Sequence, residues 1–559
     1  MTQENEPRWE ISRRRALKLG IGFAATSMFG RAGYADAPVP TKVVKTTNGP
    51  VQGLVENGVQ TFKGLRYASP PLGPLRFMPP KKPNPWTDVA DATRLGSASM
   101  QLRTGGSAVS YPGNVGQALT QLYTPADDVA HQNEDCLFLN VWTPSLENTK
   151  AGKRPVMVWF HGGGFNYGSG SWPAYDGHNL ASRHDVVVVT VNHRLNAFGY
   201  MYVGDLLGEP YATSGNAGQL DLIAVLEWVR DNVAEFGGDP GNVTIFGQSG
   251  GGGKVSALLA MPGAKGLFHR AIIESGPGIR GVPKDVASGV AAAVLSELQI
   301  GPADAKSLLS ISAQQFAAAT AAMQAKSGGA PGTGGLRFAP VVDGIALLNH
   351  PFDPVAPVVS ANVPVMIGCT KDEQTLYNVG QPWWSKLTDA ELSQKAKAIP
   401  GVGNKAEALI AAFRKLRPGD SPSYLYTDVA SSTFAFANSI RLAERKAALK
   451  AASVYFYVFQ WGASVDDGIL RAPHTMEIPF AFDNIDKGPL LLGHDPEVSK
   501  LGKVVSETWV AFARTGNPNH SGLPHWPSYD AEKRATMTFN APCKVVNDLE
   551  GEVRKILET

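Results

Sequence analysis

The stretch "GQSGGGGKVS", residues 247–256, places one serine, Ser249, among glycines. Glycine in a helix interior is destabilising by roughly 1 kcal/mol relative to alanine, because it loses the most conformational freedom on folding. Four consecutive glycines directly after the serine therefore need an explanation. They clear the side chains from the surroundings of a single hydroxyl group.

The residues on either side of this stretch predict a strand and a helix. "NVTIF", residues 242–246, is β-branched and aromatic, which is typical of a buried strand. "KVSALLAMPG", residues 254–263, has helical spacing and ends in Pro-Gly, which stops a helix. We therefore expect Ser249 on a sharp strand-to-helix turn, where free amide groups can meet a developing negative charge.

The pentapeptide at residues 247–251 matches G-x-S-x-G, the pattern of a nucleophilic serine on such a turn in α/β-hydrolases. Glycine-rich turns that contain serine are common, so the pentapeptide alone is weak evidence. The strand before it and the helix after it favour catalysis over an ordinary turn.

A second glycine run supplies candidate oxyanion donors. A serine hydroxyl is a poor nucleophile unless a base, an orienting carboxylate and oxyanion donors assist it. "PVMVWFHGGGFNYGSG", residues 155–170, is an apolar run followed by His161 and three glycines. Such glycines bring bare amide groups close to a substrate oxygen. Alone they could form an ordinary turn, but the Ser249 pattern favours the catalytic interpretation.

Several separated segments resemble the type-B carboxylesterase and cholinesterase family of α/β-hydrolases, from about residue 40 to the C-terminus. The matching segments are "FKGLRYASPPLGPLRF" (62–77), "EDCLFLNVWTP" (134–144), the stretch before and through the serine (215–252), "ARTGNPN" (513–519) and "WPSYD" (526–530). The resemblance implies one large domain, residues 38–559.

Apolar runs that alternate with helical stretches agree with this fold. Examples are the predicted strands at residues 185–194, 270–275 and 363–370. Such an alternation indicates a large, mostly parallel central sheet covered by helices on both faces. Inserted gorge and lid segments are expected between the strands.

The family's triad runs in the order Ser, Glu, His. Its acid lies in a turn that "GCTKDEQTLY", residues 368–377, resembles. Chemistry alone does not distinguish Asp372 from Glu373, and the resemblance favours Glu373. The base lies in a turn that resembles "APHTMEIPFAF", residues 472–482, which implies His474. The resulting order, Ser249 to Glu373 to His474, is that of α/β-hydrolases.

The same resemblance implies that Gly163, Gly164 and Gly250 donate to the oxyanion. Two positions depart from the family pattern, which has glutamate before the serine and alanine after it: here they are Gln248 and Gly250. Gln248 is a candidate substrate-binding residue. It removes a negative charge beside the site, so we expect weaker attraction for cationic substrates. The implied substrate is an uncharged carboxylic ester with an apolar or aromatic portion.

Two other functions remain open for this chain. The same triad could hydrolyse amides, carbamates or lactones. Some relatives in this family are adhesion modules that have lost the nucleophile, but this chain retains Ser249, Glu373, His474 and the glycine loop.

The N-terminal residues 1–37 are typical of a secretory signal. "SRRRALK", residues 12–18, precedes an apolar run too short to span a bilayer, and its Arg13-Arg14 pair resembles the twin-arginine export signal. Cleavage is expected after Ala35 or Ala37. A basic disordered tail is the alternative. The signal predicts a periplasmic or secreted bacterial enzyme, with the twin-arginine export machinery as partner of the precursor.

Composition argues against several other classes of function. The net charge of +2 suggests no basic stripe for nucleic acid, and three scattered cysteines suit neither a disulfide framework nor a zinc site. We expect no metal and no cofactor. The family's usual partner for Cys136 is replaced by Ser99, so we expect a free, buried thiol at Cys136.

Overall fold

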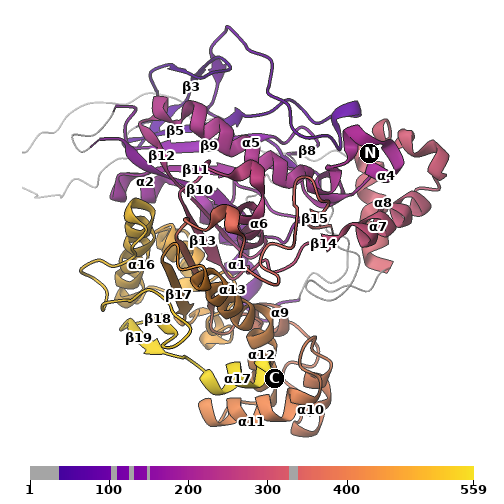
Figure 1. Ribbon diagram of the computed structural model, residues 1–559. Helices are drawn as coiled ribbons and strands as arrows, with labels where there is room; N and C mark the ends of the chain where they lie inside the picture. Colours follow the sequence, from indigo (N-terminus) through magenta and orange to yellow (C-terminus); the bar gives the residue numbers. More distant parts are fainter. Residues whose placement is uncertain (1–36, 102–109, 125–130, 148–151, 327–337) are drawn as a thin grey trace, which may run out of the picture. The chain divides into compact units, whose positions relative to one another are not determined.

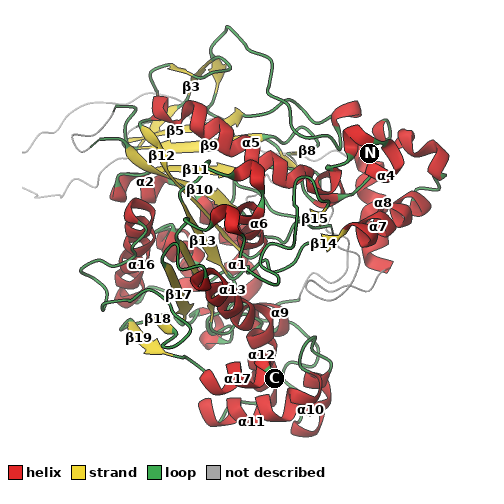
Figure 2. Cartoon of the chain, in the orientation of Figure 1, coloured by secondary structure: helices red, strands yellow, loops and turns green. Residues whose placement is uncertain are grey.

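A 12-stranded sheet is the core of the computed structural model (Figures 1 and 2). The structure describes residues 37–101, 110–124, 131–147, 152–326 and 338–559. Residues 1–36 of the predicted export signal, with Arg13 and Arg14, lie outside the described residues. The segment Pro38–Thr559 forms one unit by its internal contacts.

In the spatial order of the sheet, the strands from β11 (Val187–Val191) to β18 (Ala535–Phe539) pair in parallel. The strands beyond these two pair antiparallel. The predicted mostly parallel sheet is therefore confirmed. In spatial order the strands are β1 (Val39–Pro40), β4 (Leu54–Glu56), β5 (Val59–Arg66), β9 (Phe138–Thr143), β11 (Val187–Val191), β10 (Arg154–Phe160), β12 (Gly238–Gln248), β13 (Arg270–Glu274), β16 (Val365–Thr370), β17 (Val454–Phe459), β18 (Ala535–Phe539) and β19 (Lys544–Asn547).

Helices and small sheets occupy the connections between these strands. The α-helices are α1 (Val115–Tyr123), α2 (His178–His184), α3 (Asn196–Tyr200), α4 (Gly204–Leu207), α5 (Ala217–Asn232), α6 (Gly250–Ala260), α7 (Lys284–Glu297), α8 (Ala313–Lys326), α9 (Thr375–Asn378), α10 (Asp389–Lys397), α11 (Ala406–Leu416), α12 (Pro422–Ser431), α13 (Ala437–Ala448), α14 (Ile478–Ala481), α15 (Pro489–Leu492), α16 (Pro496–Thr515) and α17 (Gly551–Glu558). The small sheets pair β2 (Val44–Lys45), β3 (Pro50–Gln52) and β6 (Ala90–Asp91), β7 (Ala98–Ser99) with β8 (Gln132–Asn133), and β14 (Val282–Pro283) with β15 (Val341–Val342).

Alternate side chains of each central strand enter two separate cores, one on each face of the sheet. In β10, Val156, Val158 and Phe160 pack into the core that contains α5, α6 and α13. Met157 and Trp159 pack into the other core, with α2, α14 and α16. Because both faces are buried, the strands read as continuous apolar runs.

Helix α6 begins earlier than the sequence predicted. We expected helical residues from Lys254, but the helix starts at Gly250, so the glycine run forms its first turn. Helix propensity is overridden here by packing against the sheet. A Cβ atom on Gly251 would lie 2.0 Å from the carbonyl oxygen of Phe160, so only glycine allows the helix to approach β10 this closely.

The described part of the chain contains no single helix long and apolar enough to cross a membrane. Helix α7 and the adjoining segment Pro302–Leu309 meet the length and composition criteria only as a pair, bent by 82°. All three cysteines lie in the described part and are free, and Cys136 is buried beside Ser99, as expected.

Candidate active site

The predicted catalytic residues lie on loops that follow the carboxyl ends of parallel strands. The glycine loop follows β10, Ser249 follows β12, Glu373 follows β16, and His474 lies in the connection after β17. Because these strands are parallel neighbours, their carboxyl ends share one edge of the sheet. Ligands of open α/β sheets bind at this edge.

Ser249 occupies a strained backbone conformation at the N-cap of α6, with φ of 57° and ψ of −123°. Its amide group donates to the carbonyl oxygen of Glu274 at 2.7 Å, and its carbonyl oxygen accepts from Gly253 at 3.0 Å. Such strain persists only where the surroundings enforce it. The serine is partly exposed while Gln248 and Gly250 are buried, so the turn presents the hydroxyl to solvent.

The carboxylate of Glu373 contacts the Nδ1 atom of His474. Both side chains are buried. The Thr370 amide group donates to the other carboxylate oxygen at 2.9 Å, and the His474 amide group donates to the Glu373 carbonyl oxygen at 3.2 Å. A carboxylate on Nδ1 selects the tautomer that leaves Nε2 free to accept a proton.

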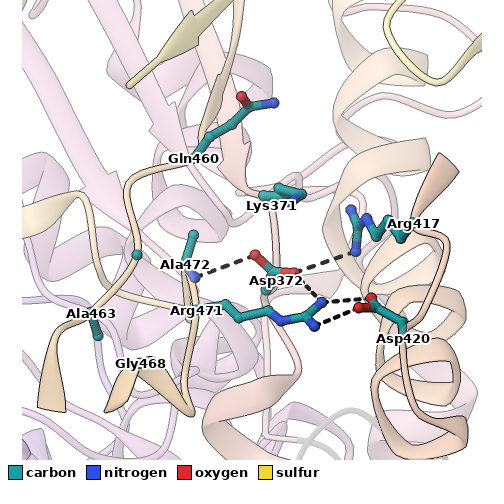
Figure 3. Close-up of a pocket in the computed structure, with 10 residues that line it drawn as sticks. Lys371, Asp372, Arg417, Asp420, Gln460, Ala463, Gly468, Arg471 and Ala472 are labelled. Carbon is teal, nitrogen blue, oxygen red and sulfur yellow. Dashed lines mark hydrogen bonds and ion pairs between the residues drawn. The ribbon is translucent and has the colours of Figure 1, made fainter. Parts of the chain in front are cut away.

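Asp372, the other carboxylate that the sequence left open, interacts with different residues (Figure 3). Its oxygens accept from Arg417 Nη1 and from the Ala472 amide group, each at 3.3 Å. These residues line a cavity of about 420 Å³ together with Asp420 and Arg471. Asp372 therefore joins the loop after β16 to the loop that carries His474, whereas Glu373 contacts the histidine ring.

Gln248 connects the serine turn to the histidine. Its Nε2 atom lies 3.3 Å from both ring nitrogens of His474. Within the described residues no hydrogen bond joins the Ser249 hydroxyl to His474. In enzymes without bound substrate this bond is often long and shortens only in the Michaelis complex. Gln248 is buried, at 1% exposure, and its amide group faces the His474 ring.

The glycine loop after β10 has its carbonyl groups engaged and key amide groups free. The Gly163 carbonyl oxygen accepts from Asn166 and Tyr167, at 3.3 and 3.2 Å. In contrast, the amide groups of Gly163, Gly164 and Gly250 have no acceptor among the residues that the structure describes. Such unpaired amide groups are suited to bind an oxyanion.

The glycine loop lies directly against the first turn of α6. A Cβ atom on Gly250 would lie 2.0 Å from the carbonyl oxygen of Gly164. Alanine, the family's usual residue at this position, would therefore force the loop away from the helix. Gly250 brings the two segments that carry the amide groups closer together.

Two further carboxyl groups lie buried beside the triad. Trp509 donates to Glu274 at 2.9 Å, and Ser275 donates to Glu477 at 3.0 Å. Burial raises the pKa of Glu274 to about 8 and raises the pKa of Glu477 well above its usual value. Burial therefore favours the neutral, protonated form of both carboxyl groups.

Sequence reasoning missed two aromatic side chains beside the histidine. The ring centroids of Tyr377 and Phe434 lie 5.7 and 5.4 Å from that of His474, and both residues are partly exposed. Phe434 lies in the short π-helix Ser432–Phe436 between α12 and α13. Short π-helical segments are frequent at functional sites, but no sequence signal indicated this one.

Replacing Gln248 by glutamate is expected to favour the protonated imidazole of His474, because a negative charge would then lie next to the ring. The acidic limb of kcat/KM should therefore move to higher pH by about 1 unit. The pH profile of Gln248→Glu, with the neutral Gln248→Met as control, measures this shift. An acidic limb that stays in place in both variants would contradict the assignment of Gln248 to the site.

Comparisons with known proteins identify the family to which this chain is similar. The model of the Carboxylesterase family matches residues 40–555. Para-nitrobenzyl esterase of Bacillus subtilis (strain 168) is 36% identical over 519 residues, covering 92% of this chain and 98% of the relative. Liver carboxylesterase of Sus scrofa is 35% identical over 545 residues, covering 91% of each chain.

A solved structure shows the same fold over nearly the same length. The crystal structure of the carboxylesterase of Geobacillus stearothermophilus at pH 6.2 superposes with a TM-score of 0.77 and 35% identity, covering 92% of this chain and all of that one. The chain therefore belongs to the carboxylesterase family, has the α/β-hydrolase fold, and is a carboxylic-ester hydrolase.

Proposed function

We propose that Ser249, His474 and Glu373 hydrolyse the ester through a covalent acyl-enzyme intermediate. The contact of Glu373 with Nδ1 of His474, at the sheet edge that also presents Ser249, carries this proposal. Nε2 of His474 accepts the proton of the serine hydroxyl as the oxygen attacks the ester carbonyl. The amide groups of Gly163, Gly164 and Gly250 then bind the oxyanion.

Collapse of this tetrahedral intermediate completes the first half of the reaction. His474 returns the proton to the leaving alcohol, and the acyl group remains on Ser249. Water, deprotonated by His474 in the same way, then attacks the acyl-enzyme and releases the acid. Glu373 stabilises the imidazolium that forms in each step.

The substrate we propose is an uncharged ester with an apolar or aromatic portion. The partly exposed rings of Tyr377 and Phe434 provide apolar surface beside His474. Gln248 is neutral, and burial favours the neutral form of Glu274. These residues give a cation little electrostatic advantage over a neutral ester of the same shape.

Labelling with a fluorophosphonate tests the proposed nucleophile. The reagent phosphonylates an activated serine, so one equivalent should attach to the peptide that contains Ser249. Peptide mapping by mass spectrometry locates the adduct, and heat-denatured enzyme serves as the unreactive control. Stoichiometric labelling of another serine would contradict the proposal.

We further propose that residues 1–37 direct export through the twin-arginine route, so that the mature enzyme is periplasmic or secreted. The Arg13-Arg14 pair and the short apolar run support this interpretation. The three free cysteines also support it, because the fold needs no disulfide and can form before export.

Replacing both Arg13 and Arg14 by lysine should leave active, uncleaved enzyme in the cytoplasm. Lysine keeps the positive charge, so a loss of export would reflect recognition of arginine rather than charge alone. Cell fractionation and N-terminal sequencing measure the outcome, with a single replacement of Arg15 by lysine as the matched control. Normal processing of the double variant would contradict this route.

A further inference from the structure

Lys254 is a buried lysine that the catalytic scheme does not use. It lies on α6, one turn after Gly250, and its side chain has no exposed area. Within the described residues it forms no ion pair with a carboxylate. Burying an amino group without an opposite charge costs free energy, so a lysine at this position needs other interactions that offset the cost.

The amino group of Lys254 joins α6 to both ends of the glycine loop. Its Nζ atom donates to the carbonyl oxygens of His161 and Gly164, each at 2.9 Å. The same atom lies 5.5 Å from the centroid of the Phe165 ring, within range of a cation–π contact. These contacts fix the first and last residues of the HGGG stretch relative to the helix.

Glycines need such an anchor because they have no side chains that could pack. The Gly164 carbonyl oxygen, which accepts from Lys254, also lies against Gly250. Donors to an oxyanion act best within about 2.7–3.1 Å of it, so small shifts of the loop are expected to weaken the site. Lys254 is therefore placed to set the spacing between the Gly164 and Gly250 amide groups.

Among the described residues, the groups that face Lys254 carry no compensating negative charge. Burial lowers the pKa of His161, just after β10, and of His193, after β11, and the charge of Lys254 lowers both further. Arg194 acts on His193 in the same direction. From α5, neutral Gln219 donates to the Lys254 carbonyl oxygen at 3.1 Å.

Burial lowers the pKa of Lys254 to about 7. The ammonium form therefore predominates below this pH and the neutral amine above it. Hydrogen bonds from the ammonium form are charge-assisted and about twice as strong as those from a neutral donor. The anchor should therefore be stronger on the acidic side of pH 7.

We propose that Lys254 is a positioning residue, which holds the Gly164 amide group beside the Gly250 amide group so that both bind the oxyanion. This inference rests on the proposed function of these two amide groups. Because the oxyanion forms only during the reaction, loss of the anchor should lower kcat and leave KM almost unchanged.

A second buried lysine provides a matched control. Lys446 on α13 is 1% exposed, and its Nζ atom donates to the carbonyl oxygens of Ser360 and Ala361, at 2.6 and 2.9 Å. Burial lowers its pKa to about 8. It makes the same kind of contact as Lys254, but to a segment that carries none of the proposed catalytic residues.

The test compares Lys254→Met with Lys446→Met. Both variants should unfold at lower urea concentration, since each loses two hydrogen bonds from a buried amino group to carbonyl oxygens. Only Lys254→Met should lower kcat, by about 30- to 100-fold, and weaken inhibition by an alkyl trifluoromethyl ketone by the same factor. That inhibitor forms an oxyanion on the serine. The KM of Lys254→Met for the ester substrate should change less than twofold.

The pH dependence supplies a further readout. The kcat defect of Lys254→Met relative to wild type should be largest below pH 7 and should diminish as pH rises, because the wild-type anchor itself weakens. If Lys254→Met does not fold, Lys254→Gln can replace it. Glutamine is shorter than lysine but keeps an amide group that can donate, so its fall in kcat should be of the same kind and smaller.

Two results would overturn the inference. One is a Lys254→Met enzyme with the kcat and inhibitor affinity of wild type. The other is a fall in kcat accompanied by a rise in KM of the same factor, as general loosening of the fold would produce. Fluorophosphonate titration of wild type separates this question from the catalytic scheme, because a failure to label Ser249 would refute the scheme independently of Lys254.

Discussion

Replacing Ser249 by alanine is expected to lower kcat by about 10⁴- to 10⁶-fold, because no other group can form the acyl-enzyme. The remaining activity would come from the oxyanion donors and substrate binding alone. The fold should be retained, since the Ser249 hydroxyl is partly exposed and makes no hydrogen bond within the described residues. Fluorophosphonate labelling should disappear, while circular dichroism and the urea midpoint should match wild type.

Ser256 offers a matched control on the same helix. Its hydroxyl donates to the Gly252 carbonyl oxygen at 2.9 Å and accepts from Gly278 at 3.1 Å. Ser256→Ala should therefore reduce stability, yet keep stoichiometric labelling and kcat within a few fold of wild type. Labelling that survives in Ser249→Ala but is lost in Ser256→Ala would show that Ser256, and not Ser249, is the nucleophile.

The central sheet could be predicted from sequence because its strands carry a local signal. Strand β11, Val187–Val191, is an unbroken β-branched run, as expected when both faces of a parallel strand are buried. The start of α6 could not be predicted in this way. Its glycines disfavour a helix locally, and the close approach to Phe160 that favours them exists only in the folded protein.

The catalytic groups were only partly accessible to sequence reasoning. Local chemistry suggested Ser249 and the glycine loop, whereas Glu373 and His474 required the family resemblance because they lie far away in the chain. The choice between Asp372 and Glu373 depends on the direction in which each side chain leaves the end of β16. No local pattern encodes that direction.

Lys254 and Phe434 escaped prediction for a different reason. A lysine in a helical segment is normally solvated, and burial such as that of Lys254 is rare for this residue type. In the sequence, Phe434 is an ordinary apolar residue. In the structure it lies in the π-helix, and its ring packs against His474. In both cases the contacts join segments distant in sequence.

Replacing Glu373 by glutamine should lower kcat by about 10³- to 10⁴-fold with little change in KM. The glutamine amide group can donate to Nδ1 of His474, which would favour the tautomer with its proton on Nε2. That tautomer cannot accept the proton of Ser249. A neutral amide also fails to stabilise the imidazolium. Steady-state kinetics at pH values above the acidic limb measure this loss.

Asp372→Asn is the matched substitution one residue away. For this variant the structure predicts a loss of stability and little change in kcat. Asp372 is buried and accepts from Arg417, so the variant should unfold at lower urea concentration. Its kcat should remain within a few fold of wild type, because the contact between Glu373 and His474 is intact. The reverse pattern, with Asp372→Asn inactive and Glu373→Gln active, would assign the acid to Asp372. For Asp372 to contact His474, the loop after β16 would have to rotate, and this would break the hydrogen bond from the Thr370 amide group to Glu373.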